Sequence, residues 1–257
     1  MKYFVIISAG GSGERMNSPL PKQFHTLQRS LIDIENFEIV RENKLILHWT
    51  IEQFLNLKQQ VEIILVLPKK WISHWQKYYL NNNLDFAHTI VEGGLTRFHS
   101  VKEALKKVPD DAIVAIHDGV RPFASKNFIE RMLDESLDDK MVGAIPYIHT
   151  FDSLREVVKC ADEVVKDANN EDISLSQYVD RGKYFMIQTP QVFLSTPLKE
   201  AYQHPYSLSF TDDASVVEAA GYKIKLVEGE RLNIKITNED DKKAAQIILN
   251  GLSSNQI

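Results

Sequence analysis

Cysteine and long apolar runs are scarce in this sequence. Among its 257 residues Cys160 is the only cysteine, so no disulfide can form within the chain and nothing indicates an oxidising compartment. No apolar stretch approaches the roughly 20 residues needed to cross a bilayer. The short apolar run before Ser8 leads into a glycine-rich loop, which is not the pattern of a signal peptide. We therefore expect a cytoplasmic protein without a membrane partner.

The chain also lacks an excess of positive charge. Its formal net charge is −5, whereas broad binding of nucleic acid needs a basic face that displaces counterions. We expect no nucleic acid partner, while local clusters of cations for a small anionic substrate remain compatible with this total. The contents of 44% hydrophobic and 25% charged residues are ordinary for a folded domain with one core. We therefore expect a single domain over residues 1–257.

A glycine-rich loop follows the first apolar run, Tyr3–Ile7. The run is typical of a buried strand, and the loop 8–24 after it contains Gly10, Gly11 and Gly13. Glycines leave backbone N–H groups unscreened, so such a loop can wrap phosphates. Arg15 and Lys22 place two cations in the same loop. A plain turn between a strand and a helix, with solvated charges, is the alternative interpretation.

The loop fits neither of two standard phosphate motifs. A dinucleotide-binding fingerprint needs a third glycine, but Gly13 is followed by Glu14, Arg15 and Met16. A Walker loop needs Gly-Lys-Ser/Thr after its second glycine, and this is missing too. The glycines with Arg15, Met16 and the Pro-Lys-Gln of residues 21–23 resemble instead the signature of pyrophosphorylase-type nucleotidyltransferases. In that group the loop surrounds the triphosphate of a nucleotide.

Strands and helices alternate along the first part of the chain. Apolar runs predict strands at 61–67, 88–92, 112–116 and 142–146, with helices at 45–57, 71–80 and 101–108. This alternation predicts an α/β fold with a mainly parallel, Rossmann-like sheet wrapped by helices. Ligands of such sheets bind at the carboxyl ends of the strands, so the loops after Ile7, Glu92 and Ile116 are the candidates.

The last third of the chain returns to the sheet. We expect residues 185–193 to re-enter it and a short helix at 197–204. A second helix at 211–221 begins with Thr211 as its cap. Strands are expected at 222–227 and 233–237, with Lys235 pointing opposite to its apolar neighbours. A helix at 238–249 closes the fold.

Two of the candidate loops contain polar residues suited to a nucleotide. Ser100 is expected near a helix N-terminus, where free N–H groups suit phosphate or ribose oxygens, and Arg97 projects from the loop before it. Asp118 lies just past a predicted strand and precedes Gly119, so it is placed for a divalent cation bound to phosphates. A solvated loop cation for Arg97 and a turn former for Asp118 are the alternatives.

Two segments do not follow the alternation of strands and helices. Residues 28–44 contain neither glycine nor proline and alternate apolar with charged positions, which predicts a surface hairpin or a short helix without chemistry. Residues 147–179 alternate like extended strands with no helix to bury them, which predicts a projecting β-arm. A partner subunit commonly buries such an arm.

The chain resembles the 2-C-methyl-D-erythritol 4-phosphate cytidylyltransferases of the non-mevalonate isoprenoid pathway over nearly its whole length. The matching stretches follow in the family's order: 9–15, 21–23, 93–100, 117–122, 152–155, 179–181, 189–191, 211–218 and 233–237. The resemblance implies a single nucleotidyltransferase domain of the GT-A-like type. It also implies a homodimer formed through the arm at 147–179.

The resemblance further implies a Mg²⁺-dependent transferase of CTP. The phosphate oxygen of the polyol phosphate attacks the α-phosphorus and pyrophosphate leaves, so positioning and electrostatic stabilisation suffice. By position Arg15 and Lys22 match the catalytic pair, and Arg181, Lys235 and Ser153 match the substrate site. The nucleotide contacts match Ala9, Gly10, Gly11, Gly13, Gly94, Arg97, Ser100, Asp118 and Gly119, with Asp118 as the possible metal ligand.

Three departures and two alternative functions accompany this resemblance. Residues 28–44 exceed the family's short turn, Leu95 stands where an acidic residue is common, and Ser153 replaces a more frequent threonine. The ribitol-5-phosphate cytidylyltransferases share the glycine loop and the Pro-Lys-Gln. Residues 179–181 and 211–215 are closer to the methylerythritol phosphate branch. A catalytically silent nucleotide-binding regulator is the alternative of a different class.

Overall fold

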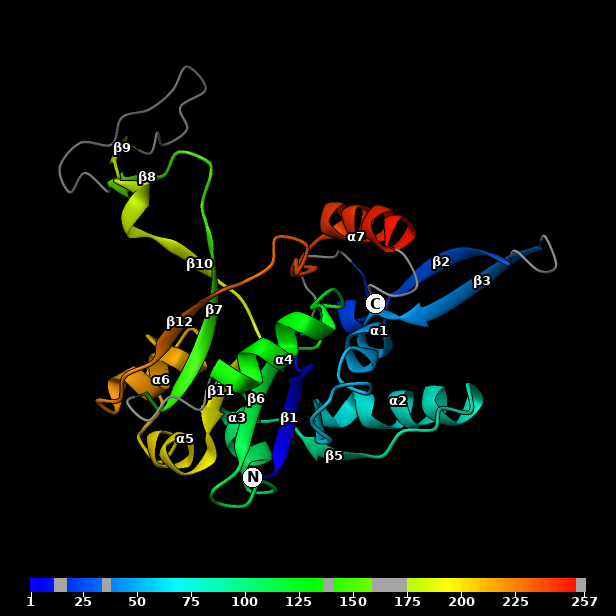
Figure 1. Ribbon diagram of the computed structural model, residues 1–257, viewed down its shortest axis with the longest axis horizontal. Helices are drawn as coiled ribbons and strands as arrows, with labels where there is room; N and C mark the ends of the chain where they lie inside the picture. Colours follow the sequence, from blue (N-terminus) through cyan, green and yellow to red (C-terminus); the bar gives the residue numbers. More distant parts are fainter. Residues whose placement is uncertain (12–17, 34–37, 136–140, 159–174, 253–257) are drawn as a thin grey trace.

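A central eight-stranded sheet organises the computed structural model, which describes residues 1–11, 18–33, 38–135, 141–158 and 175–252. The strand order is β10-β7-β11-β6-β1-β4-β5, with β12 also paired to β7 (Figure 1). The bounds are β1 Tyr3–Ser8, β4 Val61–Leu67, β5 His88–Glu92, β6 Ile113–Asp118, β7 Gly143–His149, β10 Phe185–Ile187, β11 Gln191–Leu194 and β12 Lys225–Glu228. The four strands β6, β1, β4 and β5 are parallel, while β11 runs antiparallel to β6 and β7. The predicted α/β class with a mainly parallel sheet is confirmed.

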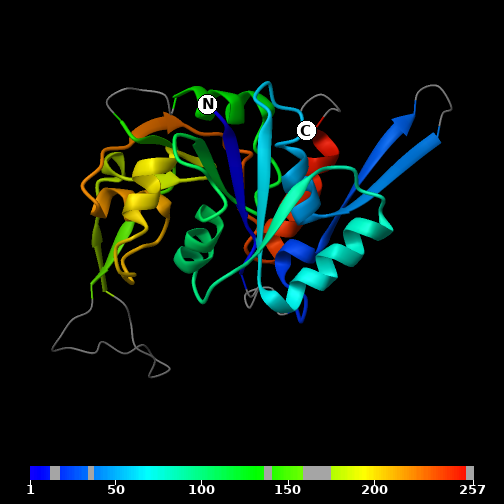
Figure 2. The same ribbon diagram turned by 90° about the horizontal axis from the view of Figure 1, so that it is seen from below.

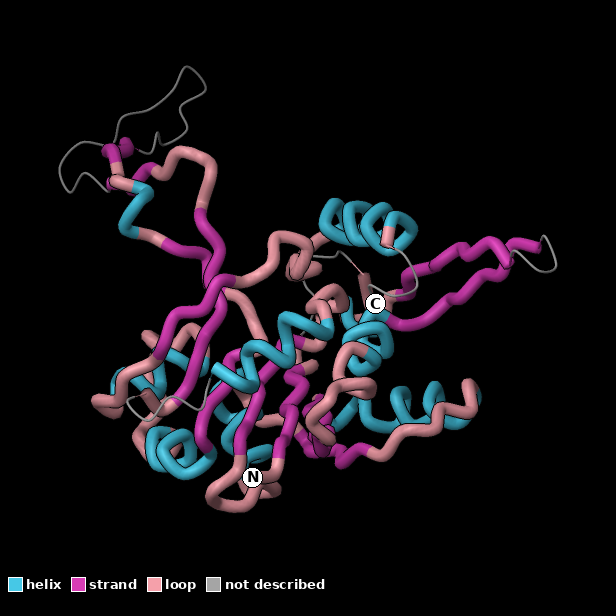
Figure 3. The backbone as a smooth tube through the Cα atoms, viewed as in Figure 1, coloured by secondary structure: helices cyan, strands magenta, loops and turns pink. Residues whose placement is uncertain are grey.

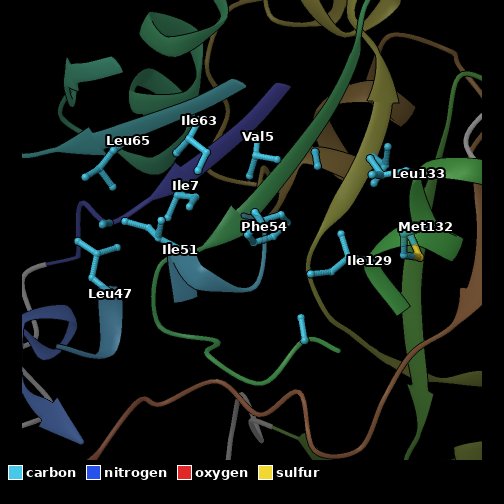
Figure 4. Packing of buried hydrophobic residues seen from close by; sticks show 14 of the residues in the cluster. Val5, Ile7, Leu47, Ile51, Phe54, Ile63, Leu65, Ile129, Met132 and Leu133 are labelled. Carbon is cyan, nitrogen blue, oxygen red and sulfur yellow. The ribbon is translucent and has the colours of Figure 1, made fainter. Parts of the chain in front are cut away.

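Helices cover both faces of this sheet (Figure 2). Their bounds are α1 Ile46–Glu52, α2 Lys69–Asn81, α3 Arg97–Leu105, α4 Lys126–Glu135, α5 Ser195–Ala201, α6 Asp213–Ala219 and α7 Glu239–Gly251, with short 3-10 turns η2 Lys22–Phe24 and η3 Arg181–Lys183. Side chains of β1 alternate between the faces, as the pleat requires. Val5 and Ile7 pack against α1 and α4 (Figure 4) and also against α2, whereas Phe4 and Ile6 pack against α3, α5 and α6. No helix among the described residues is long and apolar enough to span a membrane.

Two hairpins leave the body of the molecule in different directions (Figure 3). Strands β2 Thr26–Asp33 and β3 Glu38–Leu45 form one antiparallel pair, and β8 Arg155–Val158 and β9 Leu175–Tyr178 form the other. The segment 28–44 is thus a hairpin, one of its two predicted forms. The arm expected at 147–179 differs in its start, because Tyr147–His149 still belong to β7 and pair with β10.

Helix α7 closes the outer edge of the first hairpin. The side-chain amide of Gln246 pairs with both backbone groups of Gln28, its Oε1 accepting from Gln28 N at 2.9 Å. One turn later, Asn250 Oδ1 accepts from Ser30 N at 3.3 Å. These two amides take the place of a neighbouring strand. The C-terminal helix and the N-terminal hairpin therefore form one unit.

Several predicted boundaries were wrong. Residues 233–237 form an extended loop and not a strand, although Ile236 is buried and Lys235 exposed as the alternation required. Helix α3 begins at Arg97, because Thr96 caps it through a bond from His99 N. Helix α6 is capped by Asp212 and not by Thr211, since Asp212 Oδ1 accepts from Ser215 N at 2.9 Å.

Candidate active site

A cavity of about 210 Å³ opens at the carboxyl ends of β1, β5 and β6. This is the edge at which the sequence predicted ligand binding, since the loops after these three strands meet there. The cavity is lined by Ser8, Ala9, Gly10, Gly11, Lys22, Gln23, Gly94, Leu95, Thr96, Arg97, Ser100, Asp118, Val120 and Lys235. Most of the residues expected to contact a nucleotide therefore lie together, whereas Gly13 and Arg15 fall outside the described residues.

Gln23 holds the glycine loop in place. Its side chain is buried, and its Nε2 donates to Ala9 O at 2.6 Å and to Gly11 O at 3.3 Å. Lys22 precedes it in η2 and lines the cavity, where its Cε lies 3.9 Å from the position a Cβ on Gly11 would take. The Pro-Lys-Gln sequence thus couples a cation at the cavity to the backbone of the loop.

The second loop of the cavity is shaped by Ser100 and Gly94. Gly94 N donates to Ser100 Oγ at 3.1 Å, so the serine fixes the turn before α3. A side chain at position 94 would come within 2.5 Å of His99 Cβ, a distance that requires glycine. Leu95, between these positions, is almost fully exposed.

Asp118 ends β6 and is nearly buried at the floor of the cavity. Its Oδ2 accepts from Lys235 Nζ at 2.9 Å and from Arg121 Nε at 3.2 Å, and its Oδ1 lies 3.8 Å from Arg97 Nε. Burial by itself would raise the pKa of Asp118, but these three cations hold it well below its usual range. In the folded protein the carboxylate is therefore ionised at neutral pH.

Gly119 allows the strand end to approach the glycine loop. Its N–H donates to Ser8 O at 2.9 Å. A Cβ at this position would lie 3.0 Å from Ala9 Cβ and 3.1 Å from Leu47 Cδ1, closer than ordinary packing allows. Gly119 thus brings Asp118 beside the loop.

Arg97 forms a two-pronged ion pair that the sequence did not reveal. Its Nη1 and Nη2 donate to Asp213 Oδ1 and Oδ2 at 2.8 and 2.6 Å. Burial would lower the pKa of Arg97, but Asp213 and Asp118 raise it above its ordinary value, so the guanidinium keeps its charge. The signal available was the pair of acids at 212–213. Their partner lies more than a hundred residues away in sequence and could not be read from spacing.

His117 and Thr189 tie the end of β6 to the loop before β11. His117 Nε2 lies 3.0 Å from Arg121 O and its Nδ1 lies 3.1 Å from Thr189 Oγ1, which also accepts from Asp118 N. A carbonyl only accepts, so Nε2 carries the proton and Nδ1 accepts from the threonine. Burial lowers the pKa of His117 to about 4, which keeps the ring neutral.

A second cavity, of about 270 Å³, adjoins the first. The two share the three charged residues Arg97, Asp118 and Lys235. The second is also lined by Arg121, Ile187, Gln188, Thr189, Gln191, Thr211 and Asp212. Lys235 therefore stands, with Arg97 and Asp118, at the junction of the two cavities.

Arg181 and Ser153 lie elsewhere in this chain. Both are exposed, and neither lines either of the two cavities. Arg181 is in η3 at the base of the β8–β9 hairpin, where its Nη1 donates to Phe151 O. The structure of one chain thus does not bring these two predicted substrate residues to Lys235.

Comparisons with known proteins agree on one family. A family model described as IspD, 2-C-methyl-D-erythritol 4-phosphate cytidylyltransferase, matches residues 3–251. The curated enzyme of that name from Bacteroides fragilis is 40% identical over 244 residues, covering 95% of this chain and 98% of its own length.

Solved structures give the same result. The 4-diphosphocytidyl-2C-methyl-D-erythritol synthase of Anaerococcus prevotii superposes with a TM-score of 0.69 at 26% identity, covering 96% of both chains. The cytidylyltransferase of Francisella tularensis has a TM-score of 0.67 at 26% identity, covering 96% of this chain and 99% of its own. Sequence and fold thus agree along nearly the whole length, and the chain belongs to the 2-C-methyl-D-erythritol 4-phosphate cytidylyltransferase family.

Proposed function

We propose that this chain transfers the cytidylyl group of CTP to 2-C-methyl-D-erythritol 4-phosphate, with CTP in the first cavity and the polyol phosphate in the second. The products are 4-diphosphocytidyl-2-C-methyl-D-erythritol and pyrophosphate, in the non-mevalonate route to isoprenoid precursors. One observation carries this assignment to the site: the two cavities adjoin and share Arg97, Asp118 and Lys235. A phosphate oxygen in the second cavity can thus reach a phosphorus in the first. We place the reaction in the cytoplasm, as the single cysteine suggests.

The first cavity supplies the groups that a triphosphate needs. Ala9, Gly10 and Gly11 of the glycine loop line it together with Lys22, and Gln23 next to Lys22 is bonded to the backbone of that loop. Catalysis then consists of aligning the attacking oxygen with the α-phosphorus and stabilising the charge that develops there. We assign that stabilisation to Lys22 together with Arg15. The nucleotide contacts are assigned to Ala9, Gly10, Gly11, Gly13, Gly94, Arg97, Ser100, Asp118 and Gly119.

Mg²⁺ belongs to the same proposal. Within the described ranges no cluster of three or more His, Cys, Asp or Glu side chains could hold a metal. Asp118 is ionised, and its Oδ1 lies 3.8 Å from Arg97 Nε, whereas Lys235 and Arg121 bind Oδ2. One carboxylate with phosphates and waters is a usual arrangement for Mg²⁺ beside a nucleotide. The residues therefore fit a metal that CTP phosphates hold and Asp118 contacts, and that neutralises phosphate charge when bound.

A homodimer completes the proposal. Large apolar side chains are exposed along β10 and the adjacent arm, namely Phe151, Val157, Tyr178, Tyr184, Phe185, Met186 and Ile187. An apolar surface of this extent on a strand and a two-stranded hairpin favours burial by a second copy of the chain. Arg181 at the base of the arm would then reach the second cavity of the partner subunit, since it does not line that of its own chain. Ser153 lies on the same arm.

The test is release of pyrophosphate from CTP with each candidate polyol phosphate. We expect release with 2-C-methyl-D-erythritol 4-phosphate and much less with ribitol 5-phosphate, because the family and the relatives above carry the first substrate in their name. Preference for ribitol 5-phosphate would establish the alternative enzyme. Absence of release with both would favour the silent regulator.

The matched variants are Lys22→Ala and Lys243→Ala. Lys22→Ala should lower kcat by about a hundredfold to a thousandfold, the typical cost of one preorganised donor, with a smaller loss of CTP affinity. Lys243 lies exposed on α7 and pairs with Asp240 at 2.8 Å, so its removal should leave kcat unchanged. Near-normal turnover of Lys22→Ala would show that the glycine loop is not the catalytic cradle.

A further inference from the structure

Asp213 is a buried carboxylate that acts next to the candidate active site without lining it. Its side chain has an exposed fraction of 0%. Arg97, its partner, lines both cavities, whereas Asp213 lines neither. The two N–H···O bonds of 2.8 and 2.6 Å fix the plane of the guanidinium as well as its distance. Asp213 can therefore influence a ligand through Arg97.

Tyr202 fixes Asp213 in turn. Its hydroxyl donates to Asp213 Oδ1 at 2.7 Å, and its ring stacks on Phe98 with centroids 4.8 Å apart. Burial and then the Asp213 carboxylate raise the pKa of Tyr202 well above its ordinary value. The hydroxyl thus stays protonated, and remains a donor, near neutral pH.

The backbone around Asp213 is held as firmly as its side chain. Gln191 accepts from Ala214 N through Oε1 at 2.9 Å and donates through Nε2 to Asp212 Oδ2 at 2.8 Å. Asp212 and Ser215 form a reciprocal cap at the same helix end. The carboxylate therefore sits at one place relative to β11 and the sheet.

Arg97 has a second carboxylate within reach. Its Nε lies 3.8 Å from Asp118 Oδ1, beyond hydrogen-bond length, while Lys235 already occupies the other oxygen at 2.9 Å. A guanidinium released from Asp213 would turn to Asp118 and lose its present orientation in the cavity. We propose that Asp213 is a positioning residue that holds Arg97 in the nucleotide cavity and apart from Asp118. This inference rests on the proposed placement of CTP in the first cavity.

The sign of one measurement separates positioning from simple electrostatics. Removing a negative charge close to an anionic nucleotide should strengthen binding if charge alone matters. Losing the orientation of Arg97 should weaken it. Asp213→Asn is nearly isosteric and keeps one oxygen for Tyr202, so calorimetric titration with CTP and Mg²⁺ reads this sign directly.

We expect Asp213→Asn to weaken CTP binding about tenfold to a hundredfold, the cost found when a carboxylate that orients a metal-binding side chain is lost. The matched control is Asp110→Asn, which removes the 2.7 Å pair with Lys199 away from both cavities and should leave the Kd unchanged. Equal or tighter binding by Asp213→Asn overturns the proposal.

A double-mutant cycle with Arg97→Ala supplies a second readout. If Asp213 acts through Arg97, adding Asp213→Asn to Arg97→Ala should cause no further loss of CTP affinity. The same addition should raise the unfolding midpoint of Arg97→Ala, because that single variant leaves a buried carboxylate without its cation. A further loss of affinity in the double variant, equal to the loss in the wild-type background, would refute action through Arg97.

Failure of the proposed function gives a different pattern. If Arg97→Ala itself leaves the CTP Kd unchanged, the placement of CTP in the first cavity is wrong, and the role of Asp213 falls with it. If Arg97→Ala weakens binding and Asp213→Asn does not, only the role of Asp213 is wrong. Should Asp213→Asn fail to fold, Tyr202→Phe carries the test: we expect a severalfold rise in Kd, and an unchanged Kd overturns the proposal.

Discussion

His117 shows how one buried side chain makes the site sensitive to acid. Its ring is completely buried between Phe54 and the loop before β11, and both nitrogens have partners. Protonation would place a charge in this environment and replace the acceptor Nδ1 with a donor. The hydrogen bonds that join the end of β6 to Thr189 therefore require His117 to be neutral.

The pH dependence of stability follows from this burial. An unfolded histidine binds a proton below about pH 6.5, whereas His117 in the folded chain does so only below about 4. Between these values the unfolded state binds more protons, so stability falls as the pH falls. The loss over this whole interval is on the order of 3 kcal/mol, of which about 2 kcal/mol falls between pH 7 and pH 5. Urea unfolding at pH 7 and pH 5 should show a smaller loss for His117→Gln than for the wild type, and equal losses would contradict this role.

Single residues of the site were predictable where local sequence carries the chemistry. Lys22 follows two prolines beside a glycine loop, and Asp118 ends an apolar strand before a glycine. Their residue types and positions were sufficient to predict that both line the first cavity. The role of Asp213 was not predictable, because it depends on Arg97, which lies on another helix. Thr189 was missed for the same reason, since its hydroxyl bonds to His117, which is distant in the sequence.

Among the elements, α7 and the loop 233–237 determine where Lys235 stands. Ile236 packs with Ala245 and Leu249 of α7 and with Val120. The loop is further fixed by Ile236 N, which donates to Val120 O at 3.0 Å. Helix α7 thus supports the junction of the two cavities from behind.

Leu249→Ala tests this support. Leu249 is fully buried, so the substitution should cost about 2–5 kcal/mol of unfolding free energy. Looser packing of Ile236 should raise KM for the polyol phosphate more than KM for CTP, because Lys235 belongs to the same loop and would move with it. Ile247→Ala on the same helix is the control, since Ile247 is 75% exposed and should change neither. An equal rise of both KM values would show that α7 does not determine the position of Lys235.

Elements were predictable where periodicity was strong and uninterrupted. The apolar runs of β1, β4 and β5 gave their positions to within a residue. Helix α4 was missed, although Phe128, Ile129, Met132 and Leu133 follow a helical spacing and are buried. Residues 233–237 alternate like a strand but pair with no strand among the described residues, because Arg121 and Asn233 hold them through side-chain bonds.

At the scale of the whole molecule, the arm and β10 present the apolar surface that one chain leaves exposed. Tyr178 is 76% and Val157 61% exposed on the β8–β9 hairpin, and all three residues of β10 are exposed as well. The sequence predicted an arm at residues 147–179 that no helix of the same chain buries. The homodimer that we propose would cover it and would bring Arg181 to the second cavity of the partner subunit.

Mixing two inactive variants tests this assembly. Lys22→Ala chains retain Arg181, and Arg181→Ala chains retain Lys22, so a mixed dimer should contain one intact composite site. Random exchange at equal amounts should then give about a quarter of wild-type pyrophosphate release. A mixture that stays inactive despite proven subunit exchange, or a fully active monomer in sedimentation, would show that Arg181 does not act across the interface.

The amide pairing between α7 and β2 has a consequence for biosynthesis. The edge of β2 that Gln246 and Asn250 cover is translated about 200 residues before these side chains exist. At typical elongation rates the hairpin waits roughly 10 to 40 s on the ribosome with that edge open. During this interval a nascent chain is a template for edge-to-edge pairing with its neighbours on a polysome. Emergence of the last helix therefore both completes the support of Lys235 and covers the open edge of β2.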